Sequence, residues 1–192
     1  MENQLKRCHW VTNDELYMRY HDLEWGKPVY DDATQFEFLI LETFQAGLSW
    51  ITILRKRENF RKAFDNFDYK KIALYQEEKI QSLLHDPGII RNSMKIRAAV
   101  NNAQRFIEIQ QEFGSFCNYI WGFTNNKVVF GNYKQPSQIP ANTPLSDLIS
   151  QDLKNRGFKF VGSTVIYAHL QATGIVNDHL ESCFKNPLNF RK

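Results

Sequence analysis

The sequence predicts an all-helical protein. Apolar side chains recur near every 3.6 residues over most of the chain, which is the period of an amphipathic helix. Strand-like alternation is scarce, and the segments between the periodic stretches contain proline or glycine. With 192 residues and a hydrophobic content of 43%, the chain can bury a substantial core as one domain or as two close lobes.

The first helical stretch is "ATQFEFLILETFQAGLSWITILRKRENFRKAF". Its apolar residues follow the helical period at Phe36, Ile40, Phe44, Leu48, Ile51 and Leu54. The stretch then becomes basic and aromatic. We therefore expect an apolar helical stripe followed by a basic helix, although a basic run is usually a solvated surface.

The rest of the chain contains further helices separated by loops. "EEKIQSLLHDPGIIRNSMKIRAAVNNAQRFIEIQQEF" predicts two helices that are broken at Asp86, Pro87 and Gly88, because proline and the residue before it disfavour a continuous helix. "NYKQPSQIPANTP" contains three prolines and is a predicted loop. "LSDLISQDLKNRGFKF" and "STVIYAHLQATG" predict helices that end at Gly157 and Gly174, whereas "NKVVFGNY" predicts a short irregular piece.

Composition limits the class of protein. No apolar run is long enough and free enough of charge to predict a membrane span, and the first residues lack the apolar core of a signal peptide. The three cysteines, at positions 8, 117 and 183, are too few and odd in number for a disulfide framework. We therefore expect a cytoplasmic protein. The net charge of +3 is too small by itself to predict nucleic-acid binding.

A possible metal-binding pair stands near the C-terminal end, in "GIVNDHLESC". His179 and Cys183 are four residues apart, so on a helix capped by Asn177 or Asp178 both side chains would lie on one face. Both could then reach one ion. A closed structural zinc site takes four nitrogen or sulfur ligands, so this pair would be half of such a site.

Cys8 and His21, near the other end of the chain, are candidates for the missing ligands. A zinc ion shared with the C-terminal pair would join the two terminal segments. His9 adds an ambiguity, because it is adjacent to Cys8 and either side chain could point inward. The alternative is that the four residues are buried cysteines and hydrogen-bonded histidines without a metal, since free cysteine packs as a small hydrophobic residue.

One carboxylate stands in unusually apolar surroundings. Between residues 36 and 54 the only ionisable residues are Glu37 and Glu42, and Glu42 has apolar neighbours and Trp50 nearby. Burying such a carboxylate costs several kcal/mol in order of magnitude unless a partner compensates it. A cationic ligand would do so. The alternative is that Glu42 faces water from a helix surface and that Trp50 belongs to the core.

Six blocks carry a resemblance to a known family: "RCHWV", "YHDLEWGKPVYDD", "LETFQAGLSWITILRKRENFRKAF", "DPGIIRNSMKI", "RGFKFVGST" and "NDHLESC". In order and spacing they resemble the 3-methyladenine DNA glycosylase I family over nearly the whole chain. The resemblance implies a helix-hairpin-helix DNA glycosylase fold in a single domain, residues 1–192, of two close helical lobes. It implies that segments 1–35 and 160–192 form a zinc-clasped part, and that the helix-hairpin-helix lies at about 78–102.

The resemblance also implies roles for particular residues. One structural zinc ion would be bound by Cys8, His21, His179 and Cys183. The base 3-methyladenine would be recognised by Glu42, which accepts hydrogen bonds from it, and by the aromatic face of Trp50, with Tyr20 and Tyr17 close by.

The hairpin "LLHDPGIIRNSMKIRAAV" would bind the DNA backbone. Gly88 would allow close approach of a phosphate, and Arg91, Lys95 and Arg97 would neutralise phosphates. The alternative is an ordinary Pro-Gly turn beside a solvated basic face.

The expected reaction is base excision from double-stranded DNA that contains 3-methyladenine. The base would be flipped into the pocket, water would replace it at the sugar C1′, and an abasic site would remain. The aspartate that most helix-hairpin-helix glycosylases use does not closely follow "GIIRNSMKI". No lysine nucleophile is indicated, so we expect a monofunctional hydrolase. We also expect a monomer. Two alternatives are a zinc-stapled DNA-binding module without activity and a zinc hydrolase, the latter disfavoured because four protein ligands close a zinc site.

Overall fold

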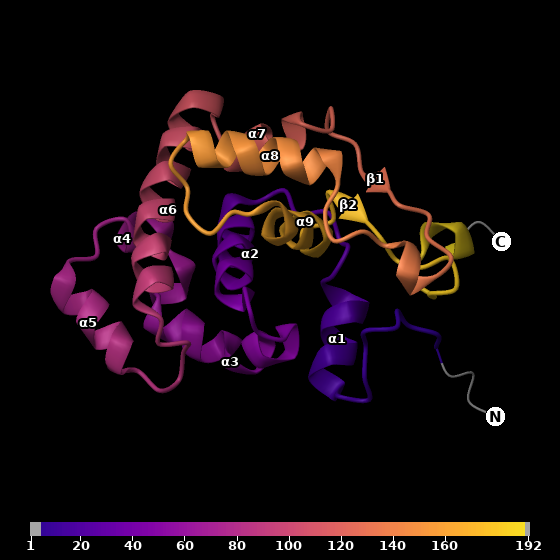
Figure 1. The fold of residues 1–192 in the computed structure, drawn as a ribbon, viewed down its shortest axis with the longest axis horizontal. Coiled ribbons are helices and arrows are strands. Elements are labelled where there is room, and N and C mark those ends of the chain that lie inside the picture. The colour runs from indigo at the N-terminus through magenta and orange to yellow at the C-terminus, as the bar shows by residue number, and fades with distance from the viewer. Residues whose placement is uncertain (1–4, 191–192) are drawn as a thin grey trace.

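The computed structural model describes residues 5–190 and is built mainly from helices (Figure 1). The α-helices of this part of the chain are α1 (Glu15–Leu23), α2 (Asp32–Gln45), α3 (Trp50–Ala63), α4 (Tyr69–Ile72), α5 (Glu77–His85), α6 (Ser93–Phe113), α7 (Phe116–Gly122), α8 (Pro144–Asn155) and α9 (Ser163–Ala172). Short 3-10 helices occupy Asp65–Phe67, Pro136–Gln138 and Pro187–Phe190. The predicted helical class is confirmed.

Two short strands, β1 (Val129–Phe130) and β2 (Val176–Asn177), form one parallel pair in which Val129 lies opposite Val176. Among the described residues, no helix has the length and apolar character needed to cross a membrane.

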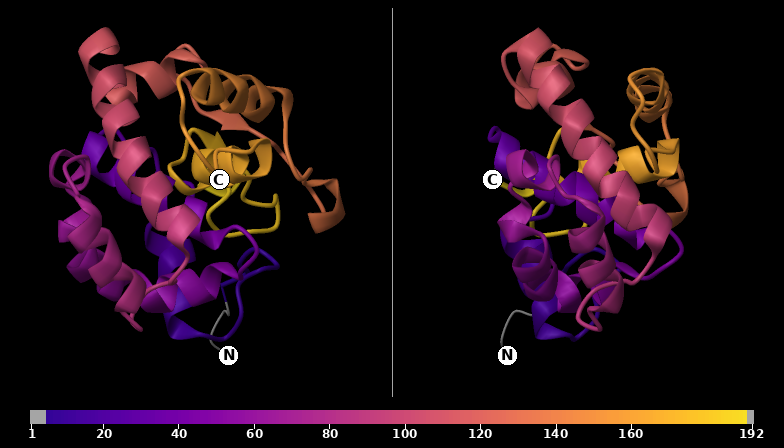
Figure 2. Two further views of the ribbon diagram at one scale, coloured as in Figure 1. Left: turned by 60° about the vertical axis from the view of Figure 1, so that its left-hand side comes forward. Right: turned by 90° about the vertical axis from the view of Figure 1, so that its left-hand side faces the viewer.

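Helix α2 is the central helix of the molecule. Its N-terminus is capped by the Asp31 side chain, which accepts a hydrogen bond of 2.8 Å from the backbone N–H of Thr34. From there the helix buries residues on nearly every side and packs against α3, α6, α7 and α9. Figures 1 and 2 show α6, the longest helix, along one side of the molecule, where it packs against α4 and α5.

The buried apolar side chains form two clusters. The larger extends from α2 through α9 and includes Phe36, Phe44, Phe106 and Trp121. The smaller lies where the N- and C-terminal segments meet; its buried members are Cys8, Tyr20, Trp25, Phe38, Leu54, Ala172, Leu180 and Cys183. Residues 1–4 and 191–192 of the predicted domain lie outside the described residues.

The apolar stripe that begins in α2 does not continue unbroken into α3. The chain leaves the helix after Gln45, Gly47 adopts a φ of +83°, and Ser49 is extended before α3 begins at Trp50. The Gln45 side chain holds this loop, because its Nε2 donates a hydrogen bond of 3.3 Å to the Leu48 carbonyl. Leu48, which the periodicity placed in the core, is therefore 39% exposed.

The expected helix around His179 and Cys183 is also absent. The chain passes from β2 into a turn closed by a 2.7 Å hydrogen bond from the Cys183 N–H to the Leu180 carbonyl. A further bond of 2.8 Å, from the Phe184 N–H to the Lys6 carbonyl, joins the two terminal segments. The i, i+4 spacing thus brings two side chains together through a turn instead of a helix face.

Candidate active site and metal centre

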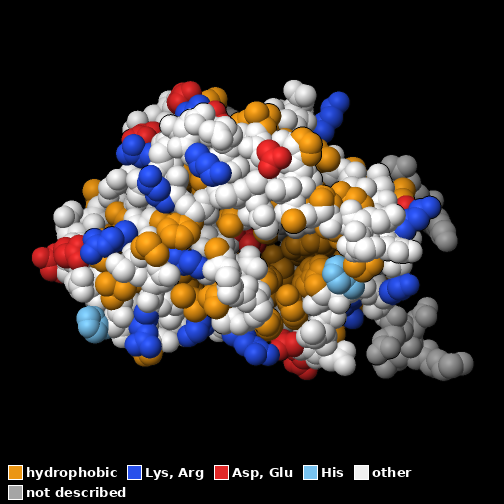
Figure 3. All heavy atoms as spheres, viewed as in Figure 1, with side chains coloured by type: hydrophobic (Ala, Val, Ile, Leu, Met, Phe, Trp, Pro, Cys, Tyr) orange, Lys and Arg blue, Asp and Glu red, His pale blue; other side chains and the backbone are white. Residues whose placement is uncertain are grey.

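A cavity of about 330 Å³ opens beside α1, α2, α3 and α9. This size lies at the lower end of the range for small-molecule sites. Figure 3 shows it as a hollow with hydrophobic side chains on its walls. The lining residues are His9, Trp10, Tyr17, Tyr20, Trp25, Glu42, Gln45, Trp50, Pro136, Ile139, Ala168 and Gln171.

Glu42 brings an ionisable group to this aromatic cavity. The residue is 3% exposed, and no charged or hydrogen-bonding partner among residues 5–190 offsets its burial. Burial therefore raises the pKa of the Glu42 carboxyl from its ordinary value of 4.5 to about 8. In the ligand-free protein at neutral pH this carboxyl group is mostly protonated, and a cation in the cavity would favour its ionised form.

Aromatic rings surround the cavity in contact with one another. The rings of Tyr20 and Trp50 lie 5.4 Å apart between centroids with an interplanar angle of 50°, and those of Trp10 and Tyr17 lie 5.0 Å apart at 52°. Trp25 meets Trp10 edge-on at 5.1 Å. Burial raises the pKa of Tyr20 well above its usual range, and it also raises the pKa of Tyr17. These tyrosines therefore remain neutral at physiological pH.

The structure places Glu42, Trp50, Tyr20 and Tyr17, the residues predicted for base recognition, around one cavity. Sequence reasoning missed Gln45 and Gln171, because a glutamine near the end of a helix carries no distinctive pattern. Trp10 and Trp25, which carried no predicted role, also line the cavity. Their only signal was their place in the N-terminal blocks of the family resemblance.

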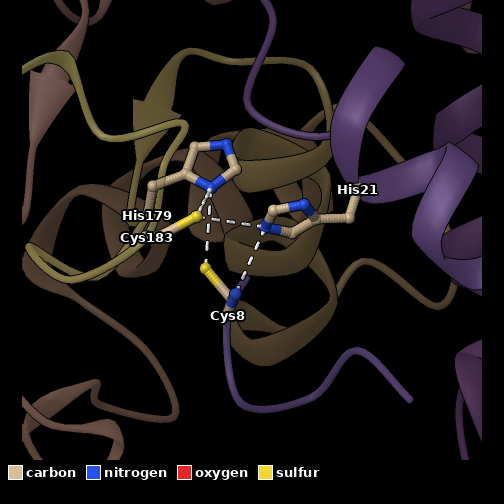
Figure 4. A group of neighbouring side chains, drawn as sticks. All are labelled: Cys8, His21, His179 and Cys183. Atoms are coloured by element: carbon tan, nitrogen blue, oxygen red, sulfur yellow. Dashed lines mark hydrogen bonds between the residues drawn. The ribbon is translucent and has the colours of Figure 1, made fainter. Parts of the chain in front are cut away.

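The four predicted metal ligands form a buried cluster (Figure 4), and their two histidine rings contact Trp10 and Trp25 of the cavity wall. The Cys8 Sγ lies 3.5 Å from the His179 Nδ1, and the Cys183 Sγ lies 3.4 Å from the His21 Nε2 and 3.5 Å from the His179 Nδ1. Sulfur and nitrogen ligands at about 2.3 and about 2.0 Å from a tetrahedral zinc ion are about 3.5 Å apart. The donor set therefore fits such an ion, and His9 is exposed instead of joining it.

The outer hydrogen bonds of the two histidines leave the correct nitrogens free for a metal. The His21 Nδ1 lies 2.7 Å from the Asp22 Oδ1, and Asp22 is paired in turn with Arg7. The His179 Nε2 lies 3.3 Å from the Trp25 carbonyl. With a proton on each of these outer nitrogens, the lone pairs of the His21 Nε2 and the His179 Nδ1 face the two sulfur atoms.

A glycine is required beside this cluster. Gly26 has a φ of +74°, and a Cβ at that position would lie 2.9 Å from the His179 Nε2. A side chain there would be strained by the backbone and would displace the ring that faces the cluster. The loop after α1 therefore helps to place a residue more than 150 positions later in the chain.

The predicted DNA-binding residues of the α5–α6 hairpin have mixed outcomes. The helices are interrupted at Asp86, Pro87 and Gly88 as predicted, and Arg91 is exposed. The Gly88 N–H is occupied, however, because it donates a hydrogen bond of 2.7 Å to the Asp86 Oδ1. The prediction for Lys95 is corrected: it is 6% exposed, and its Nζ donates to the carbonyls at the end of α2, so it is not available to a phosphate.

The loop between α8 and α9 has free backbone N–H groups, whereas the N–H of Gly88 in the α5–α6 turn is already hydrogen-bonded. Gly162 precedes α9. In the described part of the chain, nothing lies within 4 Å of a Cβ built on Gly162 and no side chain caps the helix. The backbone N–H groups of Gly162, Ser163 and Thr164 find no acceptor within residues 5–190. Exposed Lys159 lies in the same loop. Such a combination of free amides, a glycine and a cation suits a phosphate group.

Two asparagines of α6 hold this loop in place. The Asn102 side chain accepts a hydrogen bond of 2.8 Å from the Lys159 N–H and donates one of 2.9 Å to the Lys159 carbonyl, and the Asn101 side chain donates to the Gly157 carbonyl at 2.9 Å. The free amides are therefore presented by a fixed backbone. Composition and spacing alone do not favour this hairpin over the one that contains Gly88.

Comparisons with known proteins identify the family. A family model described as methyladenine glycosylase matches residues 10–186. The DNA-3-methyladenine glycosylase 1 of Escherichia coli (strain K12) is 46% identical over 185 residues, which cover 96% of this chain and 99% of that protein.

Solved structures give the same result. A crystal structure of 3-methyladenine DNA glycosylase I (TAG) matches with a TM-score of 0.92 at 46% identity and covers 95% of this chain and 100% of that chain. A variant of a 3-methyladenine DNA glycosylase I in complex with 3-methyladenine matches with a TM-score of 0.89 at 37% identity, covering 92% of this chain and 95% of that one. The chain therefore belongs to the methyladenine glycosylase family and has the TAG fold.

Proposed function

We propose that this protein is a monofunctional DNA glycosylase that releases 3-methyladenine from alkylated double-stranded DNA. The observation that carries the proposal is the buried carboxyl group of Glu42, which has no partner in the described part of the chain and lines an aromatic cavity. Methylation at N3 gives the adenine of a nucleotide a positive charge, so the damaged base supplies the counter-charge that Glu42 lacks. Undamaged adenine is neutral and gains much less from this cavity.

The cavity recognises the charged base through two kinds of contact. A cation against an aromatic face gains about 0.5 to 2 kcal/mol, and Trp50 and Tyr20 offer such faces. When the base enters, the pKa of Glu42 falls, its proton leaves to solvent, and the carboxylate accepts hydrogen bonds from the base. A charge-assisted hydrogen bond is roughly twice as strong as a neutral one, so Glu42 separates the methylated base from normal adenine.

Hydrolysis follows from the charge of the bound base. The C1′–N9 bond breaks with its electron pair going to the base, which leaves as neutral 3-methyladenine. Water adds its oxygen to C1′ and loses a proton, which produces an abasic site. The chain's contribution is to extrude the nucleotide, exclude bulk water from the aromatic cavity and hold the base in its reactive, cationic form.

Leu48 is placed to assist extrusion. It is an exposed apolar side chain in the loop that separates Glu42 from Trp50, and the Gln45 side chain fixes that loop. An apolar side chain at such a position can occupy the space that a flipped base leaves in the stack. The loop thus connects the cavity with the surface on which the duplex would lie.

For the DNA backbone, the free amides at the start of α9 and the side chain of Lys159 support a phosphate contact better than the predicted Gly88 turn does. Exposed Arg91 remains a candidate for a second contact. We infer that the α8–α9 hairpin binds the DNA backbone. The monomeric state and the cytoplasmic location stay predictions.

The metal proposed for the Cys8, His21, His179 and Cys183 cluster is one zinc ion with a structural role. Four protein ligands leave no open position, so the ion would stabilise the junction of the terminal segments, and catalysis would remain with the cavity. This favours a glycosylase over the alternative of a zinc hydrolase.

Glu42→Gln tests the proposed activity against the alternative of a DNA-binding module. The amide keeps the shape of the side chain but cannot provide a negative charge. We expect excision of 3-methyladenine to fall at least about a hundredfold, as for loss of a charged contact worth about 3 kcal/mol, with DNA affinity within about twofold. Equal excision by the two proteins would exclude this role of Glu42.

A further inference from the structure

Gln171 is a further polar side chain that lines the cavity, and it comes from α9. It lies in the last turn of α9, and its backbone carbonyl accepts a hydrogen bond of 3.0 Å from the Gly26 N–H. Glu42 comes from α2, which packs against α9. The cavity therefore receives polar side chains from two adjoining helices, Glu42 and Gln45 from α2 and Gln171 from α9.

Hydrogen bonds fix which end of the Gln171 amide faces the cavity. The Nε2 donates a hydrogen bond of 2.7 Å to the Oδ2 of Asp178, and the same oxygen accepts a hydrogen bond from the Tyr167 hydroxyl. Asp178 is 1% exposed, so its position is set by the surrounding protein. Because a carboxylate only accepts, it holds the amide nitrogen on its own side.

The amide oxygen of Gln171 is consequently left for a ligand. Among residues 5–190 no donor forms a hydrogen bond to the Oε1. This atom is also not one of the polar atoms that are fully buried without a hydrogen-bond partner, so a ligand can reach it. Gln171 lines the same cavity as Glu42, so its oxygen is a second acceptor available to a ligand there. Two acceptors in one small cavity match a group that carries two hydrogens.

We propose that Gln171 determines specificity for a 6-aminopurine: its Oε1 accepts one hydrogen of the exocyclic amine while Glu42 accepts the other, and Asp178 acts as the positioning residue. The proposal rests on the proposed glycosylase function. On 3-methyladenine the exocyclic amine is the only N–H donor. A 6-oxopurine such as 3-methylguanine places an acceptor there instead, opposite the Gln171 oxygen, and leaves that oxygen without a partner.

Gln171→Leu tests the proposal, because leucine has a similar size and no hydrogen-bonding atom. Methylated DNA is the substrate, and released 3-methyladenine and 3-methylguanine are separated by chromatography. We expect release of 3-methyladenine to fall about tenfold or more, and that of 3-methylguanine to change less than about twofold, so that selectivity drops by about the same factor. Equal loss of both activities by a folded variant with its full metal content would overturn the proposal, as would no loss at all.

Tyr167→Phe is the matched control. It also removes one hydrogen bond to Asp178, but Tyr167 does not line the cavity. We expect the control to keep the ratio of the two released bases within about twofold of the wild-type ratio. A ratio that falls as far in this control as in Gln171→Leu would assign the effect to Asp178 and overturn the role of the Gln171 oxygen.

A measurement on the wild-type protein is independent of any folding defect. Free 3-methyladenine should bind at least about tenfold more tightly than 3-methylhypoxanthine, which carries oxygen in place of the amine. Equal affinities would contradict the proposal. Failure of the proposed function gives a different result, because the wild-type protein would then release neither methylated purine from DNA.

Discussion

Glu42→Gln should make the protein more stable at neutral and alkaline pH while it removes the proposed activity. Folding raises the pKa of Glu42 from 4.5 to about 8, so the folded protein holds this proton more tightly than the unfolded chain does. The stability that the proton provides is complete below about pH 4.5 and is lost as the pH rises to about 8. Glutamine has no proton to lose and avoids this loss.

The pKa difference sets the size of the effect. Each unit corresponds to about 1.36 kcal/mol, so the loss is about 3 kcal/mol at pH 7 and reaches about 5 kcal/mol above pH 8. Denaturant unfolding of both proteins from pH 5 to 9 gives the difference between their unfolding free energies. The contributions of all other titrating groups cancel in this difference. We expect the advantage of the glutamine variant to grow by several kcal/mol across this range, on the order of the calculated loss. A difference in unfolding free energy that stays constant with pH would refute the reasoning.

Three further predictions concern activity, the metal cluster and DNA binding. Excision by the wild-type protein should increase from pH 6 to about 8, as Glu42 loses its proton more easily, and then level off; a pH–rate profile that is flat in this range would contradict the assigned pKa. Gly26→Ala should reduce the amount of bound metal and lower the Tm by at least about 3 °C, because the alanine Cβ would clash with the His179 ring. Metal analysis and thermal unfolding test this prediction, and an unchanged metal content would argue against it. Lys159→Ala should weaken DNA binding and reduce the slope of log affinity against log salt by about 1, whereas Lys95→Met should lower stability and leave that slope unchanged. Titrations at several salt concentrations distinguish these results, and identical slopes for Lys159→Ala and the wild-type protein would exclude the phosphate contact.

Local sequence signals predicted the helices well where proline or glycine interrupts the pattern. The break at Pro87 and the helix ends near Gly157 and Gly174 agree with the structure. The break between α2 and α3 was not predictable from periodicity, since Leu48 continues the apolar pattern by spacing alone. There the positive φ of Gly47 and the Gln45 side chain determine the structure.

The metal cluster shows how much spacing can predict. Spacing suggested that His179 and Cys183 act together, and Cys8 and His21 were candidates for the missing ligands. The family resemblance then implied a site of all four, and all four are clustered in the structure. The predicted helix around His179 and Cys183 was wrong. A turn after a short strand brings the two side chains together as well as a helix would.

Charge patterns were the weakest guide to DNA contacts. Lys95 belongs to a basic segment, but its ammonium group satisfies carbonyls at the C-terminal end of α2, where a positive charge is favourable. The backbone N–H groups near Gly162, which we infer to bind phosphate instead, cannot be recognised from amino-acid composition. Only the three-dimensional arrangement distinguishes a lysine that binds carbonyls inside the protein from one that faces solvent.

Release of free base from methylated double-stranded DNA tests the central claim most directly. Purified protein is incubated with the DNA, and 3-methyladenine and 7-methylguanine are separated by chromatography. We predict that the wild-type protein releases 3-methyladenine selectively and that Glu42→Gln releases almost none. No release of 3-methyladenine by folded, metal-loaded wild-type protein would contradict the account.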